Sequence, residues 1–267
     1  MLKRYRDRIE KELAAILVDT GLAPVLAESM RYALLNGGKR IRPSLMLAVC
    51  EMLGGNAERA LPFACALEMV HCYSLVHDDL PAMDNDDFRR GKPSVHKKFG
   101  EGNAILAGDG LLTEAALILC GQNGYDSAKN VIMHAALEMA SGQSYDLNEI
   151  DRTGETLELL HRQKTGALFS AAFCAGAHIS GRSDLAEQFW KTGADVGLLF
   201  QMTDDVLDAQ KDTAEHKFTY VTFYGVNTTY TLIEEIEKRI LSILSTFNNE
   251  LSGELSSLIK EISGRTK

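Results

Sequence analysis

Two clusters of aspartate, on segments far apart in the chain, could carry chemistry together. The first lies in HDDLPAMDNDD (77–87) and the second in FQMTDDVLD (200–208). Either cluster alone could be an acidic turn exposed to solvent. Crowded carboxylates repel one another, however, and hard divalent cations take oxygen ligands. Because Mg²⁺ is usually held by one or two carboxylates together with substrate phosphates, the two clusters together predict a Mg²⁺ site for a phosphorylated substrate.

The expected local structure brings the carboxylates of each cluster together. Pro81 cannot sit inside a regular helix without removing a hydrogen bond, so the helix should end there. A tight bend can then bring Asp84 back towards Asp78. In the second cluster, Asp204 and Asp208 are four residues apart on a predicted helix and share one face. Two like charges at this spacing destabilise a helix slightly unless a cation lies between them.

Two groups of basic residues fit the same chemistry. GGKRIRP (37–43) places Lys39, Arg40 and Arg42 between two helical patterns, and RRGKPSVHKK (89–98) directly follows the first aspartate cluster. Cations beside a helix N-terminus favour anion binding, because free backbone N–H groups point at the ligand. Arginine is also the natural bidentate partner of phosphate oxygens. Each group alone could be a solvated charged loop, but beside the aspartate clusters they predict phosphate binding.

Composition excludes several classes of function. The chain has 267 residues, with 37 acidic and 28 basic side chains and a net charge of −9. A nucleic-acid-binding protein needs a basic face, so we expect no nucleic acid partner. The charged N-terminal residues contain no apolar signal segment, and the least polar stretch, 166–181, is too short and interrupted to span a bilayer. The five cysteines form no CxxC pair, so we expect a cytoplasmic protein with reduced thiols and no stable membrane insertion.

Helical periodicity dominates the elements that must position these residues. Apolar residues recur at three- and four-residue spacing in segments near 25–36, 43–53, 57–79, 103–121, 127–147, 155–180, 184–208 and 229–262. The best strand candidate is 218–224. No linker or repeat divides the chain, so we expect one all-α domain over residues 1–267, a bundle of about ten helices. Two long, mostly apolar helices end in the aspartates, which predicts a deep apolar cavity with a charged mouth.

The order of these motifs resembles the trans-isoprenyl diphosphate synthases, most closely the bacterial farnesyl diphosphate synthases. The segments that carry the resemblance are GGKRIRP, HDDLPAMDNDDFRRGKPSVHKKFGE, ILAGDGLL, QKTGAL and FQMTDDVLD. The combination of two aspartate motifs with GGKRIRP is highly specific. The resemblance implies a polyprenyl synthase domain with the isoprenoid synthase fold, in which both aspartate motifs lie at the mouth of a hydrophobic pocket. Family members are commonly homodimers.

The resemblance also implies roles for individual residues. Mg²⁺, roughly three ions per site when substrate is bound, would be held by Asp78, Asp79, Asp84, Asp204, Asp205 and Asp208. The allylic diphosphate would be bound by Arg89, Lys164, Thr165, Gln201 and Lys217. Isopentenyl diphosphate would be bound by Lys39, Arg42, His71 and Arg90, with Arg40 in the same basic group. The residues expected to act in catalysis are Asp78, Asp79, Asp84, Asp204 and Lys164.

The implied reaction is a head-to-tail (1'-4) prenyl transfer that gives farnesyl diphosphate. Dimethylallyl or geranyl diphosphate would ionise while Mg²⁺ and nearby cations stabilise the departing diphosphate. The double bond of isopentenyl diphosphate would attack the carbocation, and a proton would then be lost to the released diphosphate. Because carbocations react with water, the pocket must be dry and apolar.

Tyr73 is the candidate that sets product length. It lies five residues before Asp78, roughly 7.5 Å deeper along the helix, with Ser74 beside it. In the family, an aromatic residue at this position goes with the fifteen-carbon product. The alternative reading is an ordinary core tyrosine.

Three other functions remain open from the sequence. A geranylgeranyl or geranyl diphosphate synthase would use the same chemistry and stop at another length. A class I terpene cyclase also pairs aspartate clusters with a helical cavity, but the two basic groups favour a second diphosphate substrate. A non-catalytic helical subunit would show no turnover.

One segment departs from the family pattern. After Asp208 the chain reads AQKDTAEHKFTYVTFYG (209–225), which is shorter than the family usually has. Lys217 matches the second lysine of that segment, whereas Lys211 matches the first less well. Either the loop is truly shortened or a stretch is missing from this chain.

Overall fold

Helices account for nearly all of the secondary structure in the computed structural model, which describes residues 2–18, 21–148, 151–214 and 217–265. The first half contains α1 (Leu2–Ile16), α2 (Pro24–Leu35), α3 (Ile41–Met52), α4 (Ala57–Asp78), α5 (Val95–Phe99), α6 (Glu101–Gly121) and α7 (Asp126–Leu147). The second half contains α8 (Gly154–His161), α9 (Ala167–Ile179), α10 (Ala186–Leu207), α11 (Ala209–Ala214), α12 (Tyr220–Tyr224), α13 (Val226–Leu244) and α14 (Glu250–Gly264). The predicted all-α class is confirmed. The described residues form more helices than the sequence predicts, because the predicted segments did not include the short helices α5, α11 and α12.

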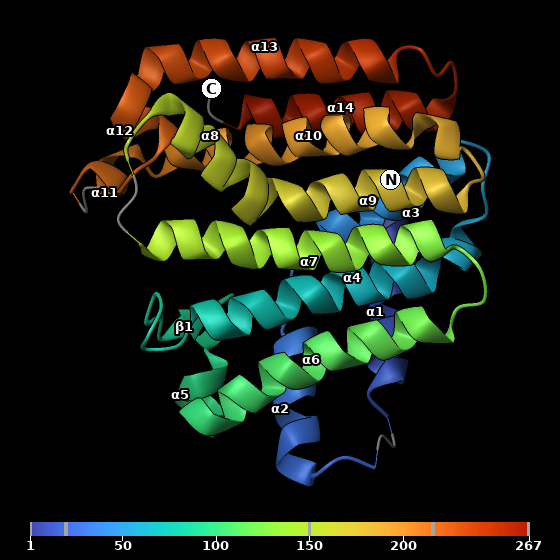
Figure 1. Ribbon diagram of the computed structural model, residues 1–267, viewed down its shortest axis with the longest axis vertical. Helices are drawn as coiled ribbons and strands as arrows, with labels where there is room; N and C mark the ends of the chain where they lie inside the picture. The colour runs from blue at the N-terminus through green and yellow to red at the C-terminus, as the bar shows by residue number, and fades with distance from the viewer. Residues whose placement is uncertain (1, 19–20, 149–150, 215–216, 266–267) are drawn as a thin grey trace.

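The long helices lie side by side in a stack. In Figure 1, α7 lies between α4 and α9, with α6 beyond α4, α10 beyond α9 and α13 beyond α10. On the far side, α3 packs against both α4 and α9, and α1 crosses α3 and α4. The C-terminal ends of α4, α7 and α10 all lie at the left end of the stack in Figure 1. That end is where the aspartates are.

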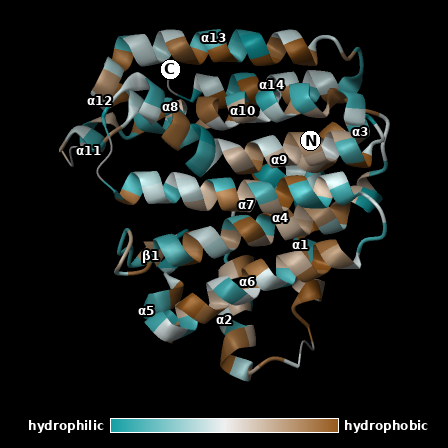
Figure 2. Cartoon of the chain, in the orientation of Figure 1, coloured by the Kyte–Doolittle hydropathy of each residue, from teal (hydrophilic) through white to brown (hydrophobic). Residues whose placement is uncertain are grey.

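Burial along the helices follows their place in the stack. Every residue of the central helix α9 except His178 is buried, as expected of a helix enclosed on all sides. The edge helix α13 instead buries one stripe, which consists of Thr229, Ile233, Ile236, Ile240 and Leu244. Figure 2 shows the corresponding mixture of hydrophobic and hydrophilic residues on α13.

Two of the predicted helical segments are divided in the structure. The segment 155–180 runs through a single π-helical turn, Arg162–Gly166, between α8 and α9. The segment 229–262 breaks between α13 and α14, where the side chain of Asn249 accepts a hydrogen bond from Ser252 N at 3.0 Å and begins α14. Asparagine is a favoured N-cap residue because its side chain satisfies a free N–H of the first turn.

The predicted strand at 218–224 is wrong, because this segment forms α12. Thr219 and Thr222 make a capping box: Thr222 N donates to Thr219 Oγ1, and Thr219 N donates to Thr222 Oγ1. Reciprocal capping fixes the start of a helix locally and overrides the strand preference of the aromatic and β-branched residues. The strands in the described part of the chain are β1 (Phe88–Arg89) and β2 (Lys92–Pro93), which form a small antiparallel hairpin after the first aspartate cluster.

Helix α6 is long and apolar enough to cross a membrane by length and composition, with a mean hydropathy of 1.6 over its most apolar window. Helices of a protein core pass the same test. In the fold, α6 packs along α4 and α2 and buries Ala104, Ala107, Leu111 and Ala115 at helical spacing. The opposite face of α6 is exposed.

Candidate active site

Two adjoining cavities lie at the end of the stack where α4, α7 and α10 finish. The larger, about 820 Å³, is lined by residues of both aspartate clusters, including Asp84 and Asp204, and by Lys217. The smaller, about 380 Å³, extends along α4 and α7 and is lined mostly by apolar groups. Lys164 and Leu147 line both cavities. The arrangement therefore is a charged mouth leading to a more apolar interior.

The first aspartate cluster bends as its sequence predicts. Helix α4 ends at Asp78, and the turn through Pro81 folds back so that Asp84 N donates to Asp78 O at 2.8 Å. The Asp78 carboxyl is partly buried. Burial raises its pKa to about 6 and Asp84 adds to the rise, while Lys164 opposes it. A carboxylate held in this way favours a cation beside it.

The second residue of this cluster, Asp79, faces away from the cavities. Its carboxylate is 2% exposed and accepts from Arg89 Nε at 2.9 Å and from Arg89 Nη2. The pair joins the end of α4 to the β1–β2 hairpin. This geometry places Asp79 and Arg89 in an ion pair within the protein, and the roles expected of Asp79 at the metal and of Arg89 at the diphosphate stay predictions.

The second cluster presents Asp204 and Asp208 at the mouth. The two residues are joined by the last helical hydrogen bond of α10, from Asp208 N to Asp204 O at 2.9 Å. Burial raises the pKa of Asp204. The nearby charge of Asp208 raises it further, while the charges of Arg265, Lys39 and Arg42 lower it. Lys39 is exposed, and its effect on the pKa of Asp204 shows that its charge reaches the second cluster.

Asp205, next in the chain, belongs to a hydrogen-bonded chain that crosses three elements. Thr165 Oγ1 donates to Gln201 Oε1 at 2.9 Å, Gln201 Nε2 donates to Asp205 Oδ1 at 2.8 Å, and Tyr220 N donates to Asp205 Oδ2 at 2.9 Å. Asp205 is 2% exposed, and burial raises its pKa to about 6. Each oxygen accepts one hydrogen bond from a protein donor, and Asp205 also lines the larger cavity, so its assignment to the metal stays a prediction. Its role here is to anchor α12 and orient Gln201.

The π-helical turn carries Lys164 and Thr165 to the junction of the cavities. Such turns inside α-helices frequently occur at functional sites. Two glycines of neighbouring helices let it pack closely: a Cβ at Gly142 of α7 would overlap Lys164 N, and one at Gly197 of α10 would lie 2.6 Å from Gly166 Cα. Gly166 itself has room for a Cβ, which would lie 3.6 Å from Ala194 O of α10, so the close approach of the two elements depends on Gly197.

The smaller cavity contains the predicted product-length residues and part of the basic group. Tyr73 and Ser74 line it, together with His71 and Arg42. Arg42 Nη1 lies 3.4 Å from His71 Nε2, and its guanidinium stacks on the Phe169 ring at 4.4 Å. Burial lowers the pKa of Arg42 to about 10, and burial with the nearby arginines lowers the pKa of His71 well below its usual value. The pair is thus poorly solvated, as expected of an anion site.

Arg40 does not reach either cavity, contrary to the prediction that it binds substrate. Its side chain is 0% exposed and forms ion pairs with Glu10 and Glu68. Arg90, also predicted as a substrate contact, lies against the same segment: Arg90 Nη1 donates to Gly37 O, and a Cβ at Gly38 would lie 2.8 Å from Arg90 Cζ.

Lys217 lines the larger cavity, and its backbone N donates to Asp212 O at 3.0 Å. The possible shortening of the loop after Asp208 is not tested, because residues 215–216 lie outside the described residues.

Sequence reasoning missed two side chains of the mouth. Asp146, near the end of α7, accepts from Lys164 Nζ, and His161 lines the larger cavity with its ring 5.4 Å from that of Tyr220. Burial lowers the pKa of His161 to about 4. Asp146 could have been found, because it ends a long helix as Asp78 and Asp204 do. His161 has no such signal.

No group of three or more His, Cys, Asp or Glu side chains among the described residues lies close enough to hold a metal ion by itself. A metal bound at the mouth would therefore need oxygen ligands from another molecule.

Comparisons with known proteins agree with the geometry. Residues 23–249 match the family model described as polyprenyl synthetase. A geranylgeranyl diphosphate synthase of Cyanophora paradoxa is 43% identical over 263 residues, which cover 88% of each chain. Among solved structures, a geranyltransferase from Legionella pneumophila has a TM-score of 0.90 at 34% identity, covering 99% of this chain and 96% of that one. A geranyltranstransferase from Thermotoga maritima has a TM-score of 0.89 at 30% identity, covering 98% of each chain. The likeness confirms the expected isoprenoid synthase fold.

Proposed function

This chain belongs to the polyprenyl synthetase family and is a prenyltransferase, and we propose that it condenses an allylic diphosphate with isopentenyl diphosphate to give farnesyl diphosphate. The observation that carries the proposal is the pair of adjoining cavities that meet at Lys164. Asp84 of the first cluster and the aspartates of α10 line the charged mouth, and Asp78 and Tyr73 of α4 line the more apolar interior. A diphosphate fits the first and a prenyl tail the second.

Mg²⁺ fits the residues at the mouth. Asp78, Asp84, Asp204 and Asp208 are the carboxylates that would hold it, since Asp79 and Asp205 are used by protein donors. The need for outside oxygen ligands agrees with how Mg²⁺ binds, through few carboxylates plus substrate phosphates. When bound, the ions supply positive charge that stabilises a departing diphosphate.

The protein's own residues would bind, orient and keep water out. Lys164, at the junction, would bind the diphosphate of the allylic substrate, and Thr165 and Gln201 are held in place by the chain that ends at Tyr220 N. Arg42 and His71, with Lys39, would bind isopentenyl diphosphate. Positively charged donors that are fixed before the reaction stabilise developing negative charge without reorganisation.

The farnesyl product is proposed from the position of Tyr73. The side chain lines the 380 Å³ cavity, is partly buried, and meets the His77 ring edge-on with centroids 5.8 Å apart. An aromatic ring held by its neighbour would block further growth of the chain past this depth.

Product analysis tests this assignment. Purified protein with geranyl diphosphate, isopentenyl diphosphate and Mg²⁺ should give mainly the fifteen-carbon product. Tyr73→Ser should lengthen the main product by at least one five-carbon unit, whereas the matched change Tyr145→Ser at the outer mouth should leave it unchanged. An identical product distribution in wild type and Tyr73→Ser would refute the role of Tyr73.

A second candidate product is geranylgeranyl diphosphate. It is favoured by the curated relatives, since the 43% identical protein of Cyanophora paradoxa is a geranylgeranyl diphosphate synthase. A twenty-carbon main product from the wild-type protein would identify it as a geranylgeranyl diphosphate synthase instead.

We further propose a cytoplasmic homodimer. Leu106 and Leu117 of α6 and Leu137 of α7 are more than half exposed, and a second copy could cover this apolar face without any insertion of α6 into a membrane. All five cysteines are free and four are buried, which supports a reducing compartment. Light scattering tests the dimer, and a monomer at micromolar concentration would contradict it.

A further inference from the structure

Arg40 lies at the meeting point of four helices. Its Nε donates to Glu10 Oε1 of α1 at 2.7 Å, its Nη1 donates to Glu68 Oε1 of α4 at 2.6 Å, and its Nη2 donates to Leu34 O near the end of α2 at 2.5 Å. Arg40 itself is the N-cap of α3. All three nitrogens of the guanidinium therefore have partners within the protein, and the side chain is 0% exposed and lines neither cavity, so it does not reach a phosphate bound there.

The backbone of this segment would not hold its shape alone. Gly37, Gly38 and Arg40 all have positive φ, at 82°, 126° and 50°. For a residue with a side chain such as Arg40, this left-handed conformation is unfavourable. A strained backbone persists only where surrounding contacts enforce it. Here the contacts that enforce it are those of the Arg40 side chain.

The positive charge of Arg40 is paired with the negative charges of Glu10 and Glu68. Burial lowers the pKa of Arg40, but Glu68 and Glu10 raise it more, so the guanidinium stays charged. Glu68 is 2% exposed and the Glu10 side chain 34%. A buried ion pair of this kind contributes to the position of its groups more than to stability, because desolvation offsets much of the attraction.

We propose that Arg40 is a positioning residue, and that its network with Glu10 and Glu68 fixes the segment 37–42 so that Lys39 and Arg42 face the isopentenyl diphosphate. This inference rests on the proposed function. It gives α1 a part in the active site, although Glu10 lies outside residues 23–249 that match the family model.

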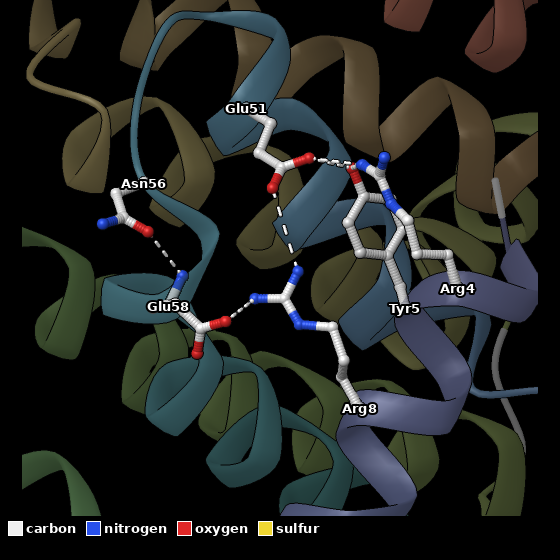
Figure 3. Close-up of polar contacts among 6 residues, drawn as sticks. All are labelled: Arg4, Tyr5, Arg8, Glu51, Asn56 and Glu58. Carbon is white, nitrogen blue, oxygen red and sulfur yellow. Dashed lines mark hydrogen bonds and ion pairs between the residues drawn. The ribbon is translucent and has the colours of Figure 1, made fainter.

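Helix α1 also has a second set of polar contacts, which serves as a control. Figure 3 shows Arg4 and Tyr5 bound to Glu51, and Arg8 bound to Glu51 and Glu58. Glu51 is eleven residues after Arg40, roughly 16 Å along α3. These contacts hold α1 to α3 and α4 without touching the segment 37–42.

The test compares the two substrates of one enzyme. Glu10→Gln should raise the KM for isopentenyl diphosphate roughly threefold to tenfold and leave the KM for geranyl diphosphate within about twofold. Arg40→Lys keeps the positive charge but not the planar guanidinium with its several N–H donors. Its KM for isopentenyl diphosphate should therefore lie between those of wild type and Arg40→Met. Glu58→Gln, the same chemical change in the control network, should leave both KM values unchanged.

A double variant separates position from fold stability. Arg40→Met with Glu68→Met removes both buried charges, so it should recover the melting temperature lost by Arg40→Met while the KM for isopentenyl diphosphate stays raised. Recovery of that KM together with stability would overturn the inference. So would an unchanged ratio of the two KM values in Glu10→Gln, a variant at a partly exposed position that should fold. Absence of turnover in the wild type would instead refute the proposed function.

Discussion

The two aspartate clusters are built alike and fixed differently. In each, the first of two adjacent aspartates lines a cavity, Asp78 the smaller and Asp204 the larger. The second, Asp79 or Asp205, is 2% exposed and accepts hydrogen bonds from protein donors. The partner of Asp79 is the charged side chain of Arg89. The partners of Asp205 are neutral, Gln201 Nε2 and Tyr220 N.

In each Asp-Asp pair, one aspartate is available to bind a cation and the other fixes the end of the helix. We call Asp78 and Asp204 the front carboxylates and Asp79 and Asp205 the back carboxylates. A front carboxylate can bind a cation only if the helix end that carries it is held in place, and the back carboxylate holds that helix end. An ion pair anchors the first cluster to a hairpin, and one neutral hydrogen bond, from Tyr220 N, anchors the second to α12. A positive charge therefore compensates Asp79 directly, whereas both hydrogen-bond donors to Asp205 are neutral and burial raises its pKa to about 6.

The largest expected effect is loss of a front carboxylate. Asp78→Asn and Asp204→Asn should each lower kcat/KM roughly 100- to 1,000-fold, because charge stabilisation in the transition state depends on them. The melting temperature of the substrate-free protein should not fall, since a neutral amide replaces a carboxylate that burial disfavours. Steady-state kinetics and calorimetry check both. Asp126→Asn, at an exposed position on α7, is the control and should keep full activity.

A smaller effect should distinguish the two back carboxylates. Asp79→Asn leaves Arg89 without its counter-charge and should lower the free energy of unfolding by about 1–3 kcal/mol. Asp205→Asn keeps one acceptor for neutral donors and should lower it by about 1 kcal/mol. Denaturant unfolding measures both. Equal losses, or a larger loss for Asp205→Asn, would mean that the charge of the partner does not matter and that the comparison fails.

The smallest effect is a pH dependence beside the second cluster. His161 packs on Tyr220, and burial lowers its pKa to about 4 from an ordinary value of 6.5. Between these pH values the unfolded chain takes up a proton that the folded chain does not. The stability contributed by neutral His161, at most about 3 kcal/mol, is therefore present above pH 6.5 and is lost as the pH falls towards 4.

The variant His161→Phe should remove that part of the acid sensitivity. Unfolding of wild type and variant at pH 7 and pH 5 gives the difference, in which the titration of Asp205 is common to both proteins. His134→Phe, at an exposed histidine of α7, should keep the wild-type dependence. A parallel loss of stability in wild type and His161→Phe would contradict the assignment.

Much of the fold, and the grouping of the aspartates within each cluster, could be predicted from the sequence. The bend that returns Asp84 to Asp78 follows from Pro81, which no helix interior accommodates. The sharing of one face by Asp204 and Asp208 follows from helix periodicity. The helix at 220–224 was missed because its signal is a local capping box within residues that prefer strands.

The sequence by itself determined which helices form and which residues can carry charge to the end of the bundle, because periodicity, proline and capping act over a few neighbouring residues. Only the tertiary structure decided which protein donors bind the second aspartate of each pair, and that Arg40 binds Glu10 and Glu68 rather than substrate. These outcomes depend on partners distant in the chain: Arg40 and Glu10 are thirty residues apart, and Asp205 and Tyr220 are fifteen. A buried charge takes whichever partner the packing of the helices brings within reach, because leaving it unpaired is costly.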